Sequence, residues 1–141
     1  MPVRRASAEW RGDLANGTGT VSTESGAVKG SYSFPSRFES GEGTNPEELV
    51  GAAHAACFSM AFSNGLAKAG FTPESVRTEA RVHLEKGEVG FSLTQIYLDC
   101  VAQVPGIDEA TFQGLAEGAK NGCPISKALA ATEIHLDVRL A

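Results

Sequence analysis

The sequence predicts an α+β fold in which antiparallel strands surround one long, buried, central helix. Three observations lead to this prediction: short β-prone runs fill the first forty residues, a long helical segment follows, and the remainder contains a strand pair, two helices and a last strand. This order lacks the regular alternation of strand and helix that a parallel α/β sheet shows. The chain has 141 residues, the length of one domain, so we expect residues 1–141 to form a single domain.

The first segment, which is rich in Gly, Ser and Thr, is expected to form a small meander of strands. Turn signals at Asn16-Gly17 and Ser25-Gly26 separate three β-prone runs. The predicted strands cover residues 5–11, 18–23 and 28–34. A flexible loop at 40–44 should then lead into the long helix.

The long helix is predicted from the residues at its two ends. Asn45 is a suitable N-cap, Pro46 suits the first helical position, and Glu48 stands three residues after the cap, which is the capping-box spacing. We expect the helix to end near Ala69, because Gly70 suits a left-handed C-terminal cap. Apolar residues occur on all sides of this helix, so it should be buried.

The expected burial of this helix also predicts a second copy of the chain. One chain of this length offers limited cover for a helix that is apolar all round. Small residues would also let another helix approach closely, and they include Gly51, Ala52, Ala55 and Ala56. We therefore expect a homodimer in which these helices pack together.

The second half of the chain should form a hairpin, two helices and a closing strand. Polar and apolar residues alternate over 76–84, which is typical of a half-exposed strand. The apolar phase of its partner changes near Gln95, which indicates a β-bulge. The predicted elements are strands at 76–84, 91–104 and 134–140 and helices at 109–121 and 124–129.

Charge and composition narrow the classes of function. The chain has 12 Lys and Arg against 17 Asp and Glu, a formal net charge of −5, and no basic run. Nucleic acids and anionic membrane surfaces are bound through cationic patches, so neither is an expected partner. We find no secretory signal segment and no apolar run that approaches the ~20 residues of a membrane span. These features predict a cytoplasmic protein that does not enter a membrane.

The three cysteines are more informative than the composition. They form no CxxC pair, so neither a structural disulfide framework nor a zinc knuckle is expected. Cys57 lies on an apolar helical stripe, where burial raises a thiol pKa, so it is either an inert core residue or a nucleophile that needs a nearby cation. Cys123 precedes Pro124 at a predicted helix N-cap, where backbone N–H groups favour a thiolate. Cys100 is expected to be a core residue.

His54 leaves two further alternatives open. It lies one helical turn before Cys57, a spacing compatible with a Cys–His pair for acyl transfer. His54, Cys57 and Cys123 could instead be zinc ligands in a metal-binding module. A histidine in an Ala-rich helix is more simply a packed, hydrogen-bonded core residue.

Three motifs carry a resemblance to a known family. They are FPSRFES at 34–40, GTNPEELVGAAHAACFSMA at 43–61 and CPISKAL at 123–129. In this order and at these separations they resemble the osmotically inducible protein C family of thiol peroxidases, which also contains the organic hydroperoxide resistance proteins. The run AAHAACFSMA is more similar to the osmotically inducible branch.

The resemblance implies a catalytic role for four residues. Cys57 matches the peroxidatic cysteine of the family, and Cys123 matches the cysteine that resolves it as a disulfide. The arginine and glutamate of the family fall on Arg37 and Glu47, which would face the thiol across the interface of an intertwined homodimer. Arg37 would hold Cys57 as a thiolate, and Glu47 would fix the guanidinium through a bidentate pair. One departure is Gly122, which stands where the family commonly has an asparagine.

The activity that the resemblance implies is reduction of organic hydroperoxides to alcohols, in defence against oxidative or osmotic stress. Cys57 would become a sulfenic acid, Cys123 would condense with it, and an external thiol or dithiol would reduce the disulfide. Neither a metal nor an organic cofactor is required. Residues expected to line an apolar pocket for the substrate are Phe38, Met60, Phe62 and Ile125.

Overall fold

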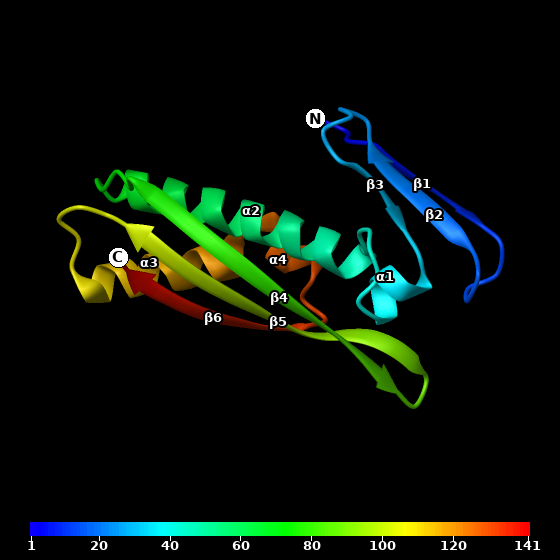
Figure 1. Cartoon of the computed structure of the whole chain (residues 1–141). Helices are drawn as coiled ribbons and strands as arrows, with labels where there is room; N and C mark the ends of the chain where they lie inside the picture. The colour runs from blue at the N-terminus through cyan, green and yellow to red at the C-terminus, as the bar shows by residue number, and fades with distance from the viewer. The chain divides into compact units, whose positions relative to one another are not determined.

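The computed structural model describes the whole chain, residues 1–141, and it confirms the α+β class with two three-stranded sheets (Figure 1). The strands are β1 (Ala6–Arg11), β2 (Thr18–Thr23), β3 (Lys29–Tyr32), β4 (Ser75–Gly87), β5 (Gly90–Gln103) and β6 (Glu133–Leu140). The helices are α1 (Phe34–Phe38), α2 (Pro46–Lys68), α3 (Glu109–Gly122) and α4 (Pro124–Ala128). The chain divides into two compact units, an N-terminal unit of residues Met1–Leu49 and a C-terminal unit of residues Val50–Ala141.

The N-terminal unit contains the predicted antiparallel meander, in the order β1-β2-β3. Gly19 of β2 pairs with Trp10 on one side and with Tyr32 on the other. A Cβ atom at this position would lie 2.5 Å from the Tyr32 ring and 2.7 Å from the Trp10 ring. The absence of a side chain at Gly19 therefore allows these two rings to pack together, with centroids 5.4 Å apart.

The segment after β3 differs from the sequence prediction. The β-prone pattern predicts a strand to residue 34, but the strand ends at Tyr32 and helix α1 follows. Ser33 caps α1 through a capping box: its hydroxyl accepts the Ser36 N–H, and the Ser36 hydroxyl accepts the Ser33 N–H. A helix of five residues is too short to show an apolar period, so only its cap could have indicated it.

The start of α2 is held by local hydrogen bonds, as the sequence predicts. The side-chain oxygen of Asn45 accepts the Glu48 N–H at 2.8 Å, which confirms Asn45 as the N-cap. The amide nitrogen of Asn45 donates to the carbonyl oxygen of Ser36 at 3.1 Å and so ties α1 to α2. Gly43 has φ +115°, a value that suits glycine, and a Cβ atom there would lie 2.6 Å from the Ser31 carbonyl oxygen.

The C-terminal unit is built on the sheet β4-β5-β6. β4 and β5 form the predicted antiparallel hairpin, and the pairing moves from His83 with Gln95 to Leu84 with Leu93. Thr94 is thus the extra residue of a β-bulge, which confirms the bulge predicted near Gln95. β6, however, pairs with β5 in parallel, so the prediction of antiparallel strands is wrong at this edge. The cause is the crossover through α3 and α4, which returns the chain to the other end of the sheet before β6 begins.

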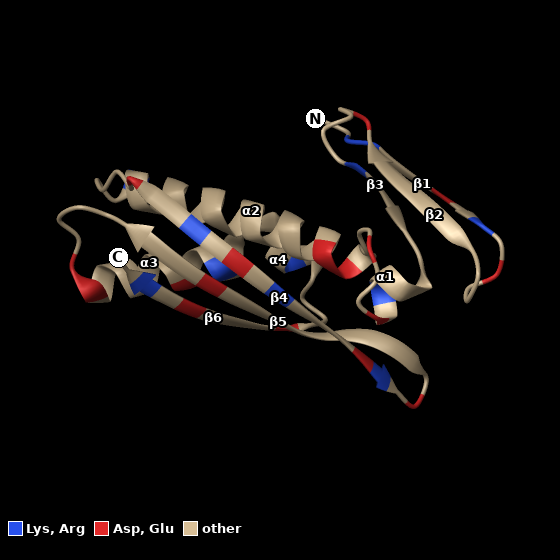
Figure 2. Cartoon of the chain, viewed as in Figure 1, with Lys and Arg blue, Asp and Glu red and all other residues tan.

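The core lies between one face of this sheet and the helices α2 and α3. Alternate residues of β5 point to this face, and its buried side chains are Ile96, Leu98, Cys100 and Ala102. The rings of Phe58 and Phe62 on α2 lie 5.7 Å apart, and Phe62 lies 5.3 Å from Phe112 on α3. Along the strands, acidic and basic positions are interspersed (Figure 2).

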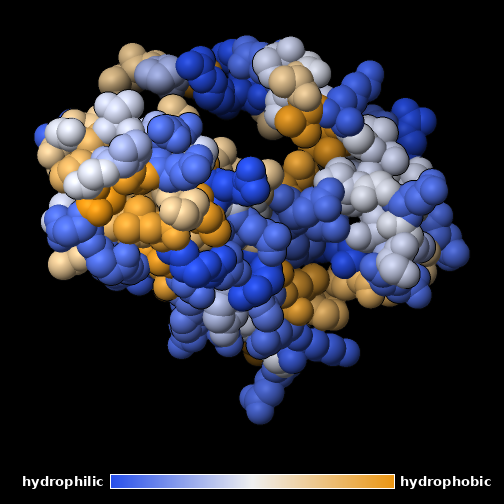
Figure 3. Space-filling model, turned by 60° about the vertical axis from the view of Figure 1, so that its left-hand side comes forward, coloured by the Kyte–Doolittle hydropathy of each residue, from blue (hydrophilic) through white to orange (hydrophobic).

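Only one side of α2 is buried, whereas the sequence predicts burial on all sides. Ala52, Ala53 and Ala56 are exposed, and Met60 is 75% exposed. Hydrophobic patches interrupt the otherwise largely hydrophilic surface in Figure 3. The homodimer expected to cover this helix stays a prediction.

α2 also contradicts the prediction that no apolar run approaches a membrane span. By length and composition alone this helix could cross a membrane, and 28% of the apolar window is buried. The polar residues that interrupt it, such as His54 and Ser59, are uncharged at neutral pH, so the mean hydropathy stays high. A core helix of a water-soluble protein can have the same length and composition, so these two properties alone do not make α2 a membrane span.

Candidate functional site

Cys57 lies in the middle of α2 and is half-buried. Burial raises the pKa of its thiol above the ordinary value, and a hydrogen bond from the Ile125 backbone N–H opposes this effect. The neighbouring sulfur of Cys123 raises the pKa of Cys57 further, because it stabilises the protonated thiol as a donor. Within the C-terminal unit, Cys57 is therefore held as a neutral thiol.

Cys123 has the opposite environment although it is fully buried. It is both the C-cap of α3 and the N-cap of α4, and its sulfur accepts the Ser126 N–H at 3.3 Å. Burial alone would raise the pKa of Cys123, but hydrogen bonds from the Ser126 hydroxyl, the Cys57 thiol and the N–H groups of Ser126 and Ile125 together lower it. This confirms the predicted N-cap and its effect on the thiol.

The structure thus brings the two predicted redox cysteines together. Cys57 and Cys123 are both free thiols and are close enough for each to shift the pKa of the other. The pKa of Cys57 is raised and the pKa of Cys123 is lowered, so the thiolate of the pair is favoured on Cys123. A thiolate on Cys57 requires a further positive charge, as the sequence also predicts. Cys100, in contrast, is fully buried in the core, as predicted, and burial raises its pKa.

Arg37 and Glu47 form a close ion pair within the N-terminal unit. The Arg37 Nε lies 3.2 Å from both carboxylate oxygens of Glu47, and its Nη2 lies 2.7 Å from Oε1. The Glu47 side chain is 11% exposed and the Arg37 side chain is 35% exposed. This confirms the predicted bidentate pair, because the fork of the guanidinium is fixed by the carboxylate. The predicted action of Arg37 on Cys57 is not tested by the structure.

His54 does not pair with Cys57. It is fully buried, and its Nε2 lies 2.7 Å from the Ser126 hydroxyl oxygen. Burial lowers the pKa of His54, so the ring stays neutral. No group of three or more His, Cys, Asp or Glu side chains is arranged to hold a metal ion. The packed-core interpretation of His54 is confirmed, and neither the acyl-transfer pair nor the zinc site is favoured.

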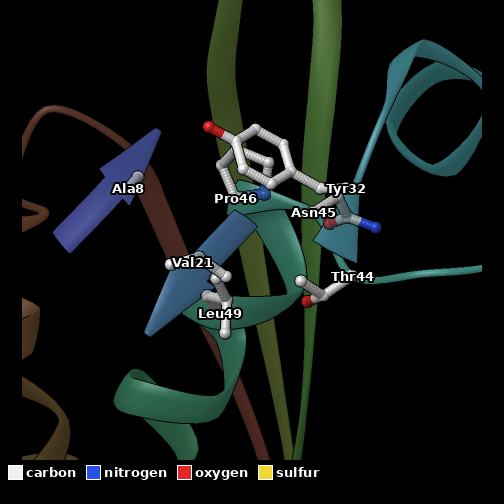
Figure 4. Close-up of a pocket in the computed structure, with 7 residues that line it drawn as sticks. All are labelled: Ala8, Val21, Tyr32, Thr44, Asn45, Pro46 and Leu49. Atoms are coloured by element: carbon white, nitrogen blue, oxygen red, sulfur yellow. The ribbon is translucent and has the colours of Figure 1, made fainter. Parts of the chain in front are cut away.

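Two hollows of the N-terminal unit border its helices, and a third, of ≈ 540 Å³, is lined by residues of the N-terminus, β1 and the end of β2. Of the two hollows beside the helices, the larger, of ≈ 380 Å³, is lined by four aromatic side chains and by Arg37, among others. Its lining residues are Trp10, Gly12, Leu14, Tyr32, Ser33, Phe34, Arg37 and Phe38. The smaller hollow, of ≈ 160 Å³, lies where β1, β2 and β3 meet the first turn of α2 and is lined by Ala8, Val21, Tyr32, Thr44, Asn45, Pro46 and Leu49 (Figure 4).

The predicted pocket residues are therefore only partly supported. Phe38 lines the aromatic hollow, and Met60 borders a separate shallow hollow beside Pro73. Phe62 cannot line a pocket, because it is fully buried in the core. The sequence prediction also missed Ser126, which contacts both His54 and Cys123. Its position three residues after the cap Cys123 is the only sequence signal that pointed to it.

Comparison with known proteins gives the family. The sequence pattern of the OsmC-like protein family matches residues 39–139. The chain is 54% identical to Peroxiredoxin OsmC of Escherichia coli (strain K12) over 138 residues, which are 97% of this chain and 96% of that protein. It is 36% identical to an Organic hydroperoxide resistance protein of Xanthomonas axonopodis pv. citri over 101 residues, 71% of this chain and 67% of that protein.

A solved structure agrees with these matches. The crystal structure of the Organic Hydroperoxide Resistance Protein OhrB of Bacillus subtilis is similar with a TM-score of 0.73 and 27% identity, over 96% of this chain and 98% of that one. The three motifs that carry the resemblance in the sequence lie within or close to the matched range 39–139. By sequence and by fold, the chain belongs to the OsmC-like protein family.

Proposed function

We infer that this chain is a thiol-dependent peroxidase that reduces organic hydroperoxides to alcohols. Its 54% identity to a protein named Peroxiredoxin OsmC, over almost the whole length of both chains, supports this activity. The similarity to proteins named for organic hydroperoxide resistance supports the substrate class. The observation in the structure that carries the proposal is the pair of neighbouring free thiols, Cys57 and Cys123, each of which shifts the pKa of the other.

We propose that Cys57 attacks the peroxide and Cys123 resolves the product. The Cys57 thiolate attacks the terminal peroxide oxygen, an S–O bond forms and the O–O bond breaks, which leaves a sulfenic acid on Cys57 and releases an alkoxide that takes up a proton to become the alcohol. The Cys123 thiolate then attacks the Cys57 sulfur, and hydroxide leaves and is protonated to water as the disulfide forms. The half-buried position of Cys57 supports its role as the thiol that meets the substrate, because Cys123 is fully buried.

We propose that Arg37 supplies the positive charge that Cys57 lacks within its own unit. At an effective dielectric constant near 20, a charge pair at ~4 Å is worth about 4 kcal/mol, enough to offset a raised thiol pKa. Glu47 would hold the guanidinium in a fixed orientation through the three hydrogen bonds described above.

We further propose that residues 1–141 act as one peroxidase domain and that two chains form an intertwined homodimer. The exposed apolar face of α2 supports the dimer.

We propose that the apolar part of the hydroperoxide is bound by the aromatic hollow that Arg37 borders. Arg37 belongs both to the lining of this hollow and to the ion pair with Glu47. A peroxide group at the guanidinium would therefore place its organic substituent against Trp10, Tyr32 and Phe34. Such a surface favours an organic hydroperoxide over hydrogen peroxide, because the latter has no apolar part to bury.

The reaction needs an external reductant but no prosthetic group. A dithiol reductant would attack the disulfide by thiol exchange and return both cysteines to the thiol state. We propose a cytoplasmic location, since the disulfide must be reduced in every cycle and a reducing compartment supplies the thiols for this step. The cellular role would be defence against peroxides formed in oxidative or osmotic stress.

Intact mass measured under denaturing conditions, with free thiols blocked, tests this mechanism. Reduced protein is mixed with one equivalent of an organic hydroperoxide, and wild type is compared with Cys123→Ser. We expect the wild type to lose two hydrogen atoms and the variant to gain one oxygen atom at Cys57. If both masses stay unchanged and all three thiols can still be alkylated, the proposed function is wrong.

A further inference from the structure

A buried chain of hydrogen bonds connects α2 to the resolving cysteine. His54 Nε2 lies 2.7 Å from the Ser126 hydroxyl oxygen, and the Ser126 N–H donates to the Cys123 sulfur at 3.3 Å. His54 and Cys123 are fully buried, and Ser126 is 5% exposed. Buried polar groups are usually retained for a structural or chemical reason, because an unsatisfied one costs free energy. None of the steps described above uses His54 or Ser126.

The single hydroxyl proton of Ser126 decides which group donates in each hydrogen bond of this chain. Ser126 has one hydroxyl proton, and its side chain, which is held beside the sulfur by the Ser126 N–H bond to Cys123, helps to lower the pKa of that thiol. If the proton points to sulfur, the hydroxyl oxygen must accept the second hydrogen bond from His54 Nε2–H. The tautomer then leaves His54 Nδ1 as a bare acceptor, and Nδ1 is indeed buried without a partner. The other tautomer would bury an N–H donor without an acceptor, which is rarer in proteins.

We propose that His54 and Ser126 are positioning residues that aim the Ser126 hydroxyl proton at the Cys123 sulfur and stabilise this sulfur as a thiolate. This role rests on the proposed function, because it belongs to the redox cycle of Cys57 and Cys123. The groups that act on Cys123 come from α2 through Cys57 and from α4 through Ser126 and Ile125. His54 acts on it only through Ser126.

The consequence concerns the reduction of the disulfide. A dithiol thiolate attacks one sulfur, forms a mixed disulfide with it and releases the other sulfur as a thiolate. A thiolate that is more stable leaves faster, so the hydrogen bond to Cys123 favours attack on Cys57 and release of Cys123. Accessibility favours the same sulfur, because Cys57 is half-buried and Cys123 is fully buried. The second thiol of the reductant then attacks the mixed disulfide and releases Cys57.

The first test uses the reduced wild-type protein. The nitrogen chemical shifts of His54 are measured in a histidine-labelled sample, and the signal is assigned among the three histidines by its loss in His54→Gln. We expect a neutral ring with the proton on Nε2, also below pH 6.5, the ordinary histidine pKa, since burial lowers the pKa of His54. A proton on Nδ1, or a charged ring, would overturn the proposal, and this result does not depend on any variant folding.

The second test measures the thiolate of Cys123 by ultraviolet absorbance against pH, with Cys57 and Cys100 replaced. Ser126→Ala keeps the backbone N–H but removes the hydroxyl, so the ratio of thiolate to thiol should fall about tenfold at a given pH. The control is Ser59→Ala, which removes a different hydroxyl, on α2, that is hydrogen-bonded to Thr78 at 2.7 Å. Ser59→Ala should leave the titration unchanged. An unchanged titration in Ser126→Ala refutes the proposal.

Two variants of His54 separate a positioning role from simple packing. His54→Leu removes the donor and should shift the Cys123 titration in the same direction as Ser126→Ala. His54→Gln offers an amide N–H at a similar distance along the side chain and should restore the wild-type titration. If His54→Leu and His54→Gln give the same titration, His54 only fills space and the proposal fails.

A redox equilibrium gives a further measurement, in protein that keeps both Cys57 and Cys123. Ser126→Ala should move the equilibrium with dithiothreitol about tenfold toward the disulfide, which corresponds to about 30 mV.

These outcomes are separate from those that test the peroxidase. Both the histidine tautomer and the thiolate titration are measured on reduced protein without peroxide. A wild type that does not react with peroxide but has the expected tautomer would refute the function and keep the hydrogen-bond chain. A protein that reacts normally but has the proton on Nδ1 would refute only the hydrogen-bond chain.

Discussion

The two units of the chain divide the parts of the proposed chemistry between them. The C-terminal unit holds both reactive thiols and the whole apolar core, from Phe58 to Val138. The N-terminal unit holds the Arg37–Glu47 ion pair and no cysteine, and it has no apolar core of this kind. The well-packed unit thus carries the nucleophile, and the thinly packed unit carries the charge.

This difference teaches where reactivity of Cys57 can come from. Within its own unit, burial and the Cys123 sulfur raise the pKa of Cys57, and the backbone N–H of Ile125 offsets this only in part. A thiol that stays protonated is a poor nucleophile, because the thiolate is the reactive form. The C-terminal unit alone therefore explains how a disulfide can form but does not explain a fast reaction with peroxide.

The largest expected effect is on the nucleophile itself. Cys57→Ser should reduce peroxide consumption to the uncatalysed rate, because a serine hydroxyl stays protonated at neutral pH. Peroxide loss is measured in the presence of a dithiol. The matched control is Cys100→Ala, which removes the core cysteine of β5 and should leave the rate within a factor of about two. If both variants lose the same fraction of the peroxide consumption rate, the loss comes from a disturbed fold and not from the missing Cys57 thiol.

The next effect compares the packing of the two units. Phe62→Ala removes a fully buried ring between Phe58 and Phe112 and should lower the free energy of unfolding by about 3–5 kcal/mol. Trp10→Ala removes a half-buried ring of the N-terminal sheet and should cost only about 1 kcal/mol. Chemical denaturation gives both values. A cost for Trp10→Ala as large as that for Phe62→Ala would break the contrast between the units.

A smaller effect tests the charge that the N-terminal unit would supply. Arg37→Ala should lower the second-order rate with an organic hydroperoxide about 10²-fold at neutral pH, since a cation near Cys57 is worth a few kcal/mol. The fold should remain, because Arg37 lies at the surface end of α1 and its side chain is 35% exposed. The rate is measured by rapid mixing, and circular dichroism checks the fold.

The same variant has a predicted pH dependence. Without Arg37, the pKa of Cys57 stays raised by its burial in the C-terminal unit. The rate of reaction with peroxide should therefore rise with pH through and beyond the ordinary thiol range. In the wild type, the thiolate should already be formed at neutral pH, so the rate should change little there. A wild-type profile that rises in parallel with the profile of Arg37→Ala would exclude Arg37 as the stabilising cation.

Much of this arrangement could be predicted from the sequence, because it is encoded locally. Asn45 as the cap of α2 and Cys123 as the cap of α4 follow from neighbouring residues alone. The bulge at Thr94 follows from a change in a period-two pattern. Each of these features is fixed within a few residues of the chain, so local patterns suffice to predict it.

Features set by distant contacts could not be predicted in this way. The parallel pairing of β5 with β6 depends on the path of α3 and α4 and not on the sequence of either strand. The contact of His54 with Ser126 joins residues 72 positions apart. The apolar character of Phe62 is compatible with a pocket or with a core, and only the packing of α2 on the sheet places it in the core. The assignment of Arg37 came from a family motif, since one arginine in a short helix has no distinguishing pattern.

The smallest expected effect concerns Glu47, and it separates orientation from charge. The carboxylate holds the guanidinium of Arg37 through contacts of 2.7 Å to 3.2 Å, but its negative charge also offsets part of the positive charge of Arg37. Glu47→Gln keeps the shape and removes this offset. If Glu47 serves to orient Arg37, the peroxide rate should fall about fivefold, which is about 1 kcal/mol, while the pKa of Cys57 does not rise. The pKa is measured from the pH dependence of alkylation in a background without the other cysteines. If the pKa of Cys57 in Glu47→Gln rises toward its value in Arg37→Ala, the guanidinium has moved away from the thiol. Glu47 would then be required to keep the positive charge near Cys57, and not only to orient the guanidinium.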